Sequence, residues 1–312
     1  MTTTHQSSSG VPMIDYLYLN QLFEKEFAHD KIKVEWHFFK GAGPAINEAL
    51  ANKQLDLAFL GDLPMIIAKA NGLDTTLLMA TNRKIRGYLA VRPNQGYSDF
   101  ASLKGKRIAI WQGTANQLSF NSILKQQGYS EKDFRLINLD PIASSAALVA
   151  GQIDAIWGGA NLLALQQKGT ADIPLSSLDV DDTAGTFQTG IVAHTDFVKQ
   201  HPQVVQRFIN TALKSAYWVS QPDHQDQAID MVVQQAGFSR DLLKLGFKGQ
   251  EFVDINSPLL DQFYLNHLQE SVNFAYEARL IKHRFNVKQW ADPHFINTAI
   301  QQLGYTQVWK QD

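Results

Sequence analysis

The stretch QLDLAFLGDLP at residues 54–64 is nearly repeated as QIDAIWGGANL at residues 152–162. Each copy starts with Gln, an aliphatic residue and Asp, continues as an apolar run and stops at glycine. A short apolar run that leads through glycine into a helical pattern is typical of a strand–helix unit of an α/β sheet. Aligning Leu50 with Leu148 places Gln54, Asp56 and Phe59 on Gln152, Asp154 and Trp157. The repeat of residues 32–72 in residues 106–169 predicts two similar lobes, although any two strand–helix units resemble each other to some extent.

Strand and helix patterns alternate over the first two thirds of the chain. The expected strands are 32–39, 55–60, 75–81, 87–93, 106–111, 134–140 and 153–157. Helical patterns separate most of them, and this alternation predicts mainly parallel sheets with helices on their faces. After about residue 195 the pattern is almost wholly helical. We therefore expect an α/β protein with a helical C-terminal region.

The composition is that of an ordinary globular protein. The chain has 312 residues, of which 45% are hydrophobic and 19% are charged, and this length favours two domains. The net charge of -2 does not favour a nucleic-acid-binding protein. The sequence lacks cysteine, which excludes a disulfide scaffold, a thiol nucleophile and a Cys-ligated metal, and which fits an oxidising compartment.

The first ten residues, MTTTHQSSSG, are polar and of low complexity. They contain no apolar segment of the kind found in a secretory signal peptide, so we expect no signal segment in this chain. We interpret residues 1–10 as a disordered leader.

Four expected strands end in turns of small residues. These turns are GAGP at 41–44, GDLP at 61–64, QGTAN at 112–116 and WGG at 157–159. Ligands of open α/β sheets bind beyond the carboxyl ends of the strands, where helix N-termini attract anions and small residues expose backbone N–H groups. Four such turns predict a cleft for a small anion or polar solute. The alternative is simple turn chemistry, with Asp62 as an N-cap and Pro44 and Pro64 in first turns.

Four longer segments resemble one known family. Residues 23–64, 97–130, 146–159 and 194–219 are similar to the solute-binding proteins of ABC importers for alkanesulfonates, nitrate and taurine. The resemblance covers roughly residues 20–290. It implies a type II periplasmic-binding-protein fold, in which each lobe is a mainly parallel sheet flanked by helices and the two lobes close on the ligand by a hinge motion.

The resemblance also implies a set of ligand contacts. Thr114 and Asn116 would donate hydrogen bonds, or else cap the following helix. Trp157 would form an apolar wall, although a tryptophan at a strand end is as often part of the core. The expected contacts are Gly41, Ala42, Gly43, Gly61, Asp62, Gln112, Gly113, Thr114, Asn116 and Trp157, with Phe187 and Gln188 added from the segment GTFQTG.

The same resemblance implies a domain organisation and partners. We expect lobe 1 at residues 11–90 plus 195–312 and lobe 2 at residues 91–194, with crossing strands at 88–93 and 189–194. The protein would be a periplasmic or lipid-anchored monomer that delivers its ligand to the transmembrane subunits of an ABC permease. We expect no cofactor, no metal and no nucleic acid.

Two other classes of protein are alternatives. One is an enzyme on the same fold, similar to thiamine-pyrimidine synthases or desulfinases, although the desulfinase pattern needs a cysteine nucleophile. The nine histidines show no metal-binding spacing, and no phosphate-binding or nucleophile-elbow motif is present. The other is the effector domain of a transcription regulator, but no helix-turn-helix pattern precedes the lobes. We therefore favour a binding protein over an enzyme, and turnover of a bound ligand distinguishes them.

Overall fold

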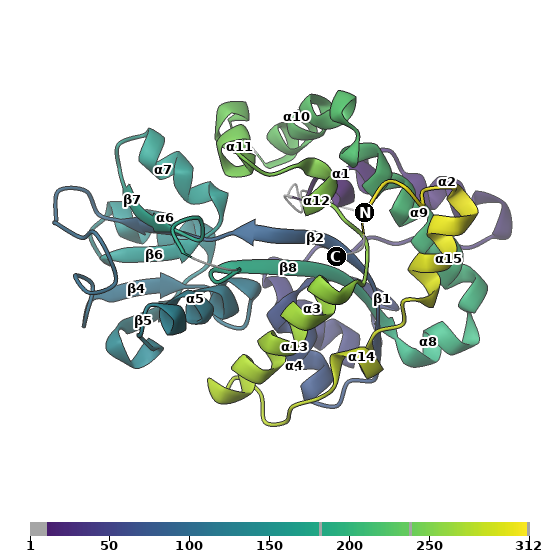
Figure 1. The fold of residues 1–312 in the computed structure, drawn as a ribbon, viewed down its shortest axis with the longest axis horizontal. Coiled ribbons are helices and arrows are strands. Elements are labelled where there is room, and N and C mark those ends of the chain that lie inside the picture. The colour runs from purple at the N-terminus through teal and green to yellow at the C-terminus, as the bar shows by residue number, and fades with distance from the viewer. Residues whose placement is uncertain (1–10, 181–182, 237–238, 311–312) are drawn as a thin grey trace.

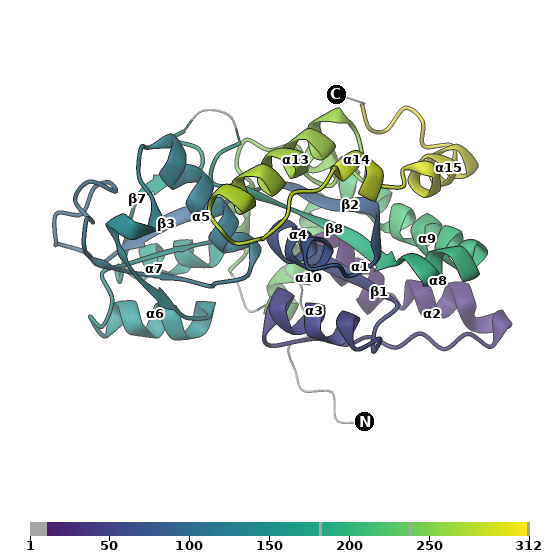
Figure 2. The same cartoon turned by 90° about the horizontal axis from the view of Figure 1, so that it is seen from below.

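The computed structural model describes residues 11–180, 183–236 and 239–310, so the expected leader at 1–10 lies outside the described residues. The described chain forms two sheets side by side, each with its own helices (Figures 1 and 2). Sheet A has the strand order β1-β8-β2 and sheet B has the order β5-β4-β6-β3-β7. One hydrophobic cluster fills the part around sheet A, and two clusters cover the two faces of sheet B. These two parts correspond to the two expected lobes, although their sheets differ in strand number and are not the similar units that the repeat predicts.

Sheet A contains β1 (Leu57–Gly61), β2 (Thr75–Arg86) and β8 (Thr186–His194). β8 lies between the other two strands and pairs antiparallel with both. The expectation of a mainly parallel sheet is therefore wrong for the pairing in this lobe. The helix α4 (Asp62–Ala70) connects β1 to β2 as in a parallel unit, but a strand from much later in the chain enters between them.

The alternating segment 32–39 is not a strand, contrary to expectation. It forms no ladder with any strand in the described part of the chain. Its Trp36 ring instead packs almost parallel to the ring of Phe59 in β1, with the centroids 6.0 Å apart. The alternating apolar side chains of this segment therefore cover the lobe without forming a sheet.

Sheet B contains β3 (Tyr88–Val91), β4 (Arg107–Ile110), β5 (Arg135–Asn138), β6 (Ala155–Gly158) and β7 (Asp172–Ser176). β4 pairs parallel with β5 and β6, as expected, whereas β3 pairs antiparallel with β6 and β7. The helices of this lobe are α5 (Ala115–Gln126), η2 (Glu131–Asp133), α6 (Pro141–Val149), η3 (Ala160–Leu162) and α7 (Leu163–Gln167).

The aspartate of the second repeat copy has a structural role. Asp154 precedes β6, and its carboxylate accepts hydrogen bonds from the backbone N–H of Arg107 at 3.0 Å and from its Nε at 3.1 Å. Arg92 forms an ion pair with the same carboxylate. Burial raises the pKa of Asp154, but these hydrogen bonds outweigh burial and hold the pKa at about 2. Asp154 thus connects β6 to β4 at the strand starts, away from the carboxyl ends.

Helices make up most of the rest of the chain, which confirms the expected helical C-terminal region. Those before β8 are α1 (Pro12–Leu19), α2 (Leu22–Phe27), η1 (Ala28–Asp30) and α3 (Ala42–Ala51). Those after it are α8 (Thr195–Gln200), α9 (Pro202–Ser220), η4 (Pro222–His224), α10 (Gln225–Ala236), α11 (Arg240–Phe247), α12 (Phe252–Ile255), α13 (Gln262–Glu277), α14 (Val287–Trp290) and α15 (His294–Leu303). In the described residues, no helix combines the length and the apolar character needed to cross a membrane.

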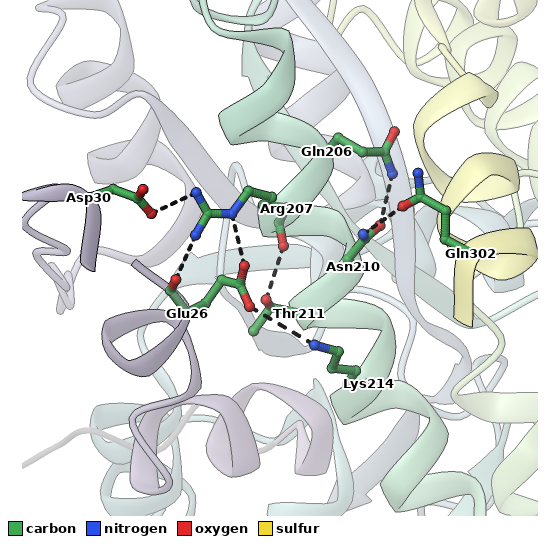
Figure 3. Close-up of polar contacts among 8 residues, drawn as sticks. All are labelled: Glu26, Asp30, Gln206, Arg207, Asn210, Thr211, Lys214 and Gln302. Carbon is green, nitrogen blue, oxygen red and sulfur yellow. Dashed lines mark hydrogen bonds and ion pairs between the residues drawn. The ribbon is translucent and has the colours of Figure 1, made fainter. Parts of the chain in front are cut away.

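The long helix α9 connects the two ends of the chain (Figure 3). On one side Arg207 forms ion pairs with Glu26 at 2.8 Å and with Asp30 at 2.7 Å. On another side the Asn210 amide donates to the side chain of Gln302 in α15 at 2.8 Å. Helices from both ends of the sequence are therefore attached to sheet A as one unit.

The chain crosses between the lobes at two points. Gly87 separates β2 in sheet A from β3 in sheet B, and a Cβ at Gly87 would lie only 2.2 Å from the Trp157 ring and 2.6 Å from the carbonyl of Gly185. The return crossing leads from β7 through Gly185 into β8. Since β3 lies in sheet B and β8 in sheet A, we propose lobe boundaries near Gly87 and Gly185, in place of the expected 90/91 and 194/195.

Candidate functional site

Loops from both lobes meet at the carboxyl ends of the strands. A Cβ on Gly61, at the end of β1, would lie 2.8 Å from the Cβ of Ala115 at the start of α5. A Cβ on Gly113 would lie 3.0 Å from the ring of Pro44 in α3. Only small residues allow these approaches, so the glycines expected to form the site also allow the two lobes to touch.

The first-lobe half of the predicted site surrounds the start of α3. Gly41 is the N-cap of this helix and Ala42 is its first residue, with φ 48°. Gly43 is buried, and a Cβ there would lie 2.2 Å from the Pro64 ring. These residues pack against the turn after β1, so the two first-lobe turns form one surface.

A small cavity lies at the carboxyl ends of β4 and β6. Its volume is about 20 Å³, which is room for about one water molecule. The residues that line it are Ala109, Ile110, Trp111, Asn116, Leu139, Pro141, Ser144, Ile156, Trp157, Gly158, Asn161 and Leu162. All of them belong to the second lobe, and none of them is charged. Of the predicted contacts, the structure brings Asn116 and Trp157 to this cavity, beside the interlobe contacts of Ala115 and Gly113.

Asn116 is the most informative residue of this cavity. It lies in the first turn of α5, and its Oδ1 is buried without a hydrogen-bond partner among the described residues. An unpaired buried polar atom costs about 1–3 kcal/mol, so such an atom points to a partner that the protein itself does not supply. Neither Asn116 nor Thr114 caps α5 through its side chain. Thr114 thus occupies the N-cap position of α5, but neither side chain forms the hydrogen bond that the capping alternative predicts.

Three other predicted donors are engaged within the chain. The N–H of Gln112 donates to the Asn138 side chain at 3.0 Å, and the N–H of Gly113 donates to Oε1 of Gln117 at 2.8 Å. The Thr114 hydroxyl donates to the carbonyl of Trp111 at 2.6 Å. A ligand that used these groups would have to displace side chains of the protein.

Trp157 is chiefly a core residue. It is 1% exposed, and its Nε1 donates to the hydroxyl of Ser119 at 3.0 Å. That hydroxyl donates in turn to the carbonyl of Gly185 at 2.6 Å. The indole thus connects sheet B to α5 and to the crossing segment, while its edge lines the cavity.

Asp62 is fully buried beside the return crossing. Its carboxylate accepts hydrogen bonds from the N–H of Leu63 at 2.7 Å and from the N–H of Gln188 at 2.9 Å. Burial raises the pKa of Asp62 to about 7, although both hydrogen bonds act to lower it. The N-cap of α4 is Gly61, so the interpretation of Asp62 as an N-cap is wrong. Its side chain instead attaches the start of α4 to β8.

The two residues added from the GTFQTG segment lie in β8. Gln188 is fully buried, its Oε1 accepts from the N–H of Lys84 at 3.0 Å, and its Nε2 lacks a partner among the described residues. Phe187 pairs with Ile85 of β2. Neither residue lines the cavity, and the structure brings Gln188 together with Asp62 instead.

The turn after β5 also lines the cavity, although the sequence pattern does not predict it. Pro141 and Ser144 line the cavity from α6, and Asn161 lines it from η3. The turn after β5 contains no glycine and so lacks the small residues that mark the other strand ends. The general rule that every parallel strand end faces the ligand would have found it.

Comparisons with known proteins identify the family of this chain. A family model described as NMT1/THI5 like matches residues 27–225. The chain belongs to this family. It is 30% identical over 284 residues to a Bacillus subtilis (strain 168) protein named for binding aliphatic sulfonates, and the match covers 90% of this chain and 82% of that protein. It is 26% identical over 201 residues to the taurine-binding periplasmic protein of Escherichia coli (strain K12), with 61% of each chain covered.

Solved structures confirm the fold. The periplasmic sulfonate-binding protein of a sulfonate ABC transporter from Methylobacillus flagellatus superposes with a TM-score of 0.83 and 28% identity, over 97% of this chain and 92% of that one. The predicted periplasmic-binding-protein fold is thus confirmed. A desulfinase from Rhodococcus erythropolis is 27% identical, but over only 50% of this chain and 41% of that enzyme. The two relatives described above that match over most of their length at 28–30% identity are named as binding proteins and not as enzymes. The desulfurization enzyme DszB shares the fold over 96% of this chain and 98% of its own, with a TM-score of 0.69, but at only 17% identity.

Proposed function

We propose that this protein captures a small organic sulfonate between its lobes and delivers it to an ABC permease. The observation that carries the proposal is the uncapped start of α5 at an uncharged cavity, next to the contacts between the lobes. The names of its full-length relatives supply the class of ligand.

The two helices that start at the cavity differ in their caps. The carboxylate of Asp140 caps α6 by accepting from the N–H groups of Ile142 and Ala143 at 2.8 and 2.9 Å. α5 has no side-chain cap, so its partial positive charge remains available to an anion. A sulfonate suits such a site, because it stays ionised at neutral pH and accepts several hydrogen bonds. The α5 start would hold the sulfonate oxygens, with the amide of Asn116 turned to present its Nδ2.

The remainder of the cavity lining suits an apolar chain. Trp111, Leu139 and Ile156 are among its residues, and these side chains offer no hydrogen bond except that of the indole N–H. An alkyl or small aromatic group would therefore lie against them. The cavity holds only about one water molecule and is lined by the second lobe alone, so its lining would have to open towards the space between the lobes to admit such a ligand, and the lobes would then close on it.

The partners and location follow from this function as further proposals. Binding proteins of ABC importers work outside the cytoplasmic membrane, where they deliver their ligand to the membrane-spanning subunits of a permease. We propose that this protein works there, as a periplasmic or lipid-anchored monomer without a bound metal or cofactor.

Isothermal titration with ethanesulfonate, taurine and nitrate tests the proposed function. We expect ethanesulfonate to bind at one site per chain and nitrate to bind more weakly, because nitrate has no group to place on the apolar residues. Native mass spectrometry of the purified protein would identify any ligand that it retains. Failure of both sulfonates to bind at millimolar concentration would contradict the proposal, and so would turnover of a bound sulfonate.

A further inference from the structure

The helix α11 joins two parts of the molecule that the chain order separates. It follows α10 in the helical C-terminal region, yet its Leu242 is 3% exposed and belongs to the hydrophobic cluster on one face of sheet B. That cluster also contains Tyr88 of β3 and Leu162 of η3. A Cβ on Gly246 would lie 3.1 Å from the Cβ of Ala160, so the helix touches η3 closely. Figure 1 shows α11 between α10 and α7, and it contacts both helices.

The end of α11 is attached to the outgoing crossing. Arg86, the last residue of β2, donates to the carbonyl of Gly246 at 3.1 Å and to the carbonyl of Lys248 at 2.7 Å. The Gln250 side chain donates to the carbonyl of Lys84 at 3.0 Å. A guanidinium that satisfies carbonyls at a helix C-terminus also complements the helix dipole. The helix is thus anchored where β2 leaves the first lobe.

The other side of α11 is attached to the first lobe. Arg240 forms ion pairs at 2.9 Å with Asp226 and with Asp230 of α10, and Lys244 pairs with Asp226 at 3.0 Å. These pairs are exposed, so each contributes little, whereas the buried Leu242 contributes an apolar contact. One helix therefore connects α10 to the face of sheet B beside Gly158 and Gly159, which precede η3.

We propose that α11 is a strap that stabilises the closed arrangement of the lobes, with or without ligand. η3 directly follows the Gly158–Gly159 turn, and Gly158 lines the cavity, so opening the lobes there would pull η3 away from α11. Leu242 would then lose its apolar surroundings, and this loss opposes opening. The strap shifts the equilibrium between open and closed lobes towards the closed arrangement, and bound ligand shifts it further in the same direction.

Leu242→Ala, with Leu245→Ala as the matched control, tests the strap. Leu245 lies on the same helix but is 42% exposed, so its removal leaves the contact with sheet B in place. Because the chain has no cysteine, Gln152→Cys and Gln301→Cys allow two spin labels, one on each lobe. Double electron–electron resonance on the protein without added ligand would then measure the distance between the lobes.

In the parent protein and in Leu245→Ala, we expect a population with a short distance between the two spin labels. Leu242→Ala should lose most of this population. If the closed fraction falls tenfold, apparent ethanesulfonate affinity falls about tenfold as well. Saturating ethanesulfonate should restore the short distance. Should Leu242→Ala not fold, Gly246→Val forces α11 away from Ala160 and should give the same loss. An unchanged distance distribution in a folded variant would overturn the strap, and this outcome does not depend on whether ethanesulfonate binds.

Discussion

The variant Asp62→Asn tests whether the buried carboxylate of Asp62 titrates or serves only as a structural hydrogen-bond acceptor. Burial raises the pKa of Asp62 from 3.8 to about 7. The folded state therefore holds the proton more tightly than the unfolded state does. The stability that this provides is fully present below about pH 4 and is lost as the pH rises through about 7. The difference between the pKa of Asp62 in the folded and unfolded states corresponds to roughly 4 kcal/mol. The free energy of unfolding of the parent protein should fall by this amount between pH 4 and pH 8.

The assay is urea unfolding of the parent protein and the variant, followed by tryptophan fluorescence, at several values between pH 4 and pH 8. The asparagine cannot titrate, and its NH₂ group would face one of the two backbone N–H donors, from Leu63 or Gln188. This mismatch should therefore lower the free energy of unfolding of Asp62→Asn by about 1–3 kcal/mol, independently of pH. On top of that constant loss, the free energy of unfolding of the parent relative to the variant should fall by roughly 4 kcal/mol from pH 4 to pH 8.

Asp56 provides the matched control, because it is an exposed aspartate immediately before β1, whereas the buried Asp62 follows the same strand. Asp56→Asn should change the free energy of unfolding by no more than about 0.5 kcal/mol across the range. Parallel stability curves for the parent protein and Asp62→Asn would refute the reasoning, because they would show that Asp62 does not change its charge between pH 4 and pH 8.

Three other variants test the site and its frame. Asp154→Asn should lower the free energy of unfolding by about 1.5–3 kcal/mol at pH 7. Because the pKa of Asp154 is lowered to about 2, this difference should narrow as the pH falls from about 4 towards 2, and a constant difference in urea unfolding would argue against the ion pairs. Gly113→Val places a β-branched residue at φ 73°, with its Cβ 3.0 Å from Pro44. It should abolish ethanesulfonate binding in calorimetry while thermal melts show a folded protein, and normal binding would mean that this turn is not part of the site. Asn116→Ala removes the unpaired amide, so it should weaken ethanesulfonate binding about tenfold without lowering the melting temperature; loss of stability with full affinity would assign it a structural role.

Much of the fold could be predicted from local patterns. Apolar runs that end in glycine identified β1 and β6, and the near-repeat around Gly61 and Gly158 identified two lobes. Which strands pair could not be predicted in this way. The side-chain pattern of β8 shows a strand, but nothing local shows that it enters between β1 and β2. The segment 32–39 has an alternating pattern, yet a strand also needs a neighbouring edge, and the described chain provides none for it.

Part of the candidate site could likewise be predicted from the sequence, and part of it could not. Gly61, Gly113 and Asn116 could be expected at the meeting of the lobes, because strand ends and helix starts follow from the pattern. The partners of Asp62 and Trp157 could not, since Gln188 and Ser119 lie far from them in sequence and meet them only through packing. The docking of Leu242 on sheet B is likewise a tertiary contact, and its helical spacing alone would place it in any apolar core.

A crystal structure of the protein with ethanesulfonate tests the central proposal most directly. The proposal predicts the sulfonate group at the start of α5, with its oxygens within hydrogen-bond distance of the Asn116 side chain and of the N–H groups around it. The ethyl group should lie against Trp111 and Leu139, which line the cavity. Ethanesulfonate bound outside the space between the lobes, with the α5 start still packed against Gly61, would contradict it.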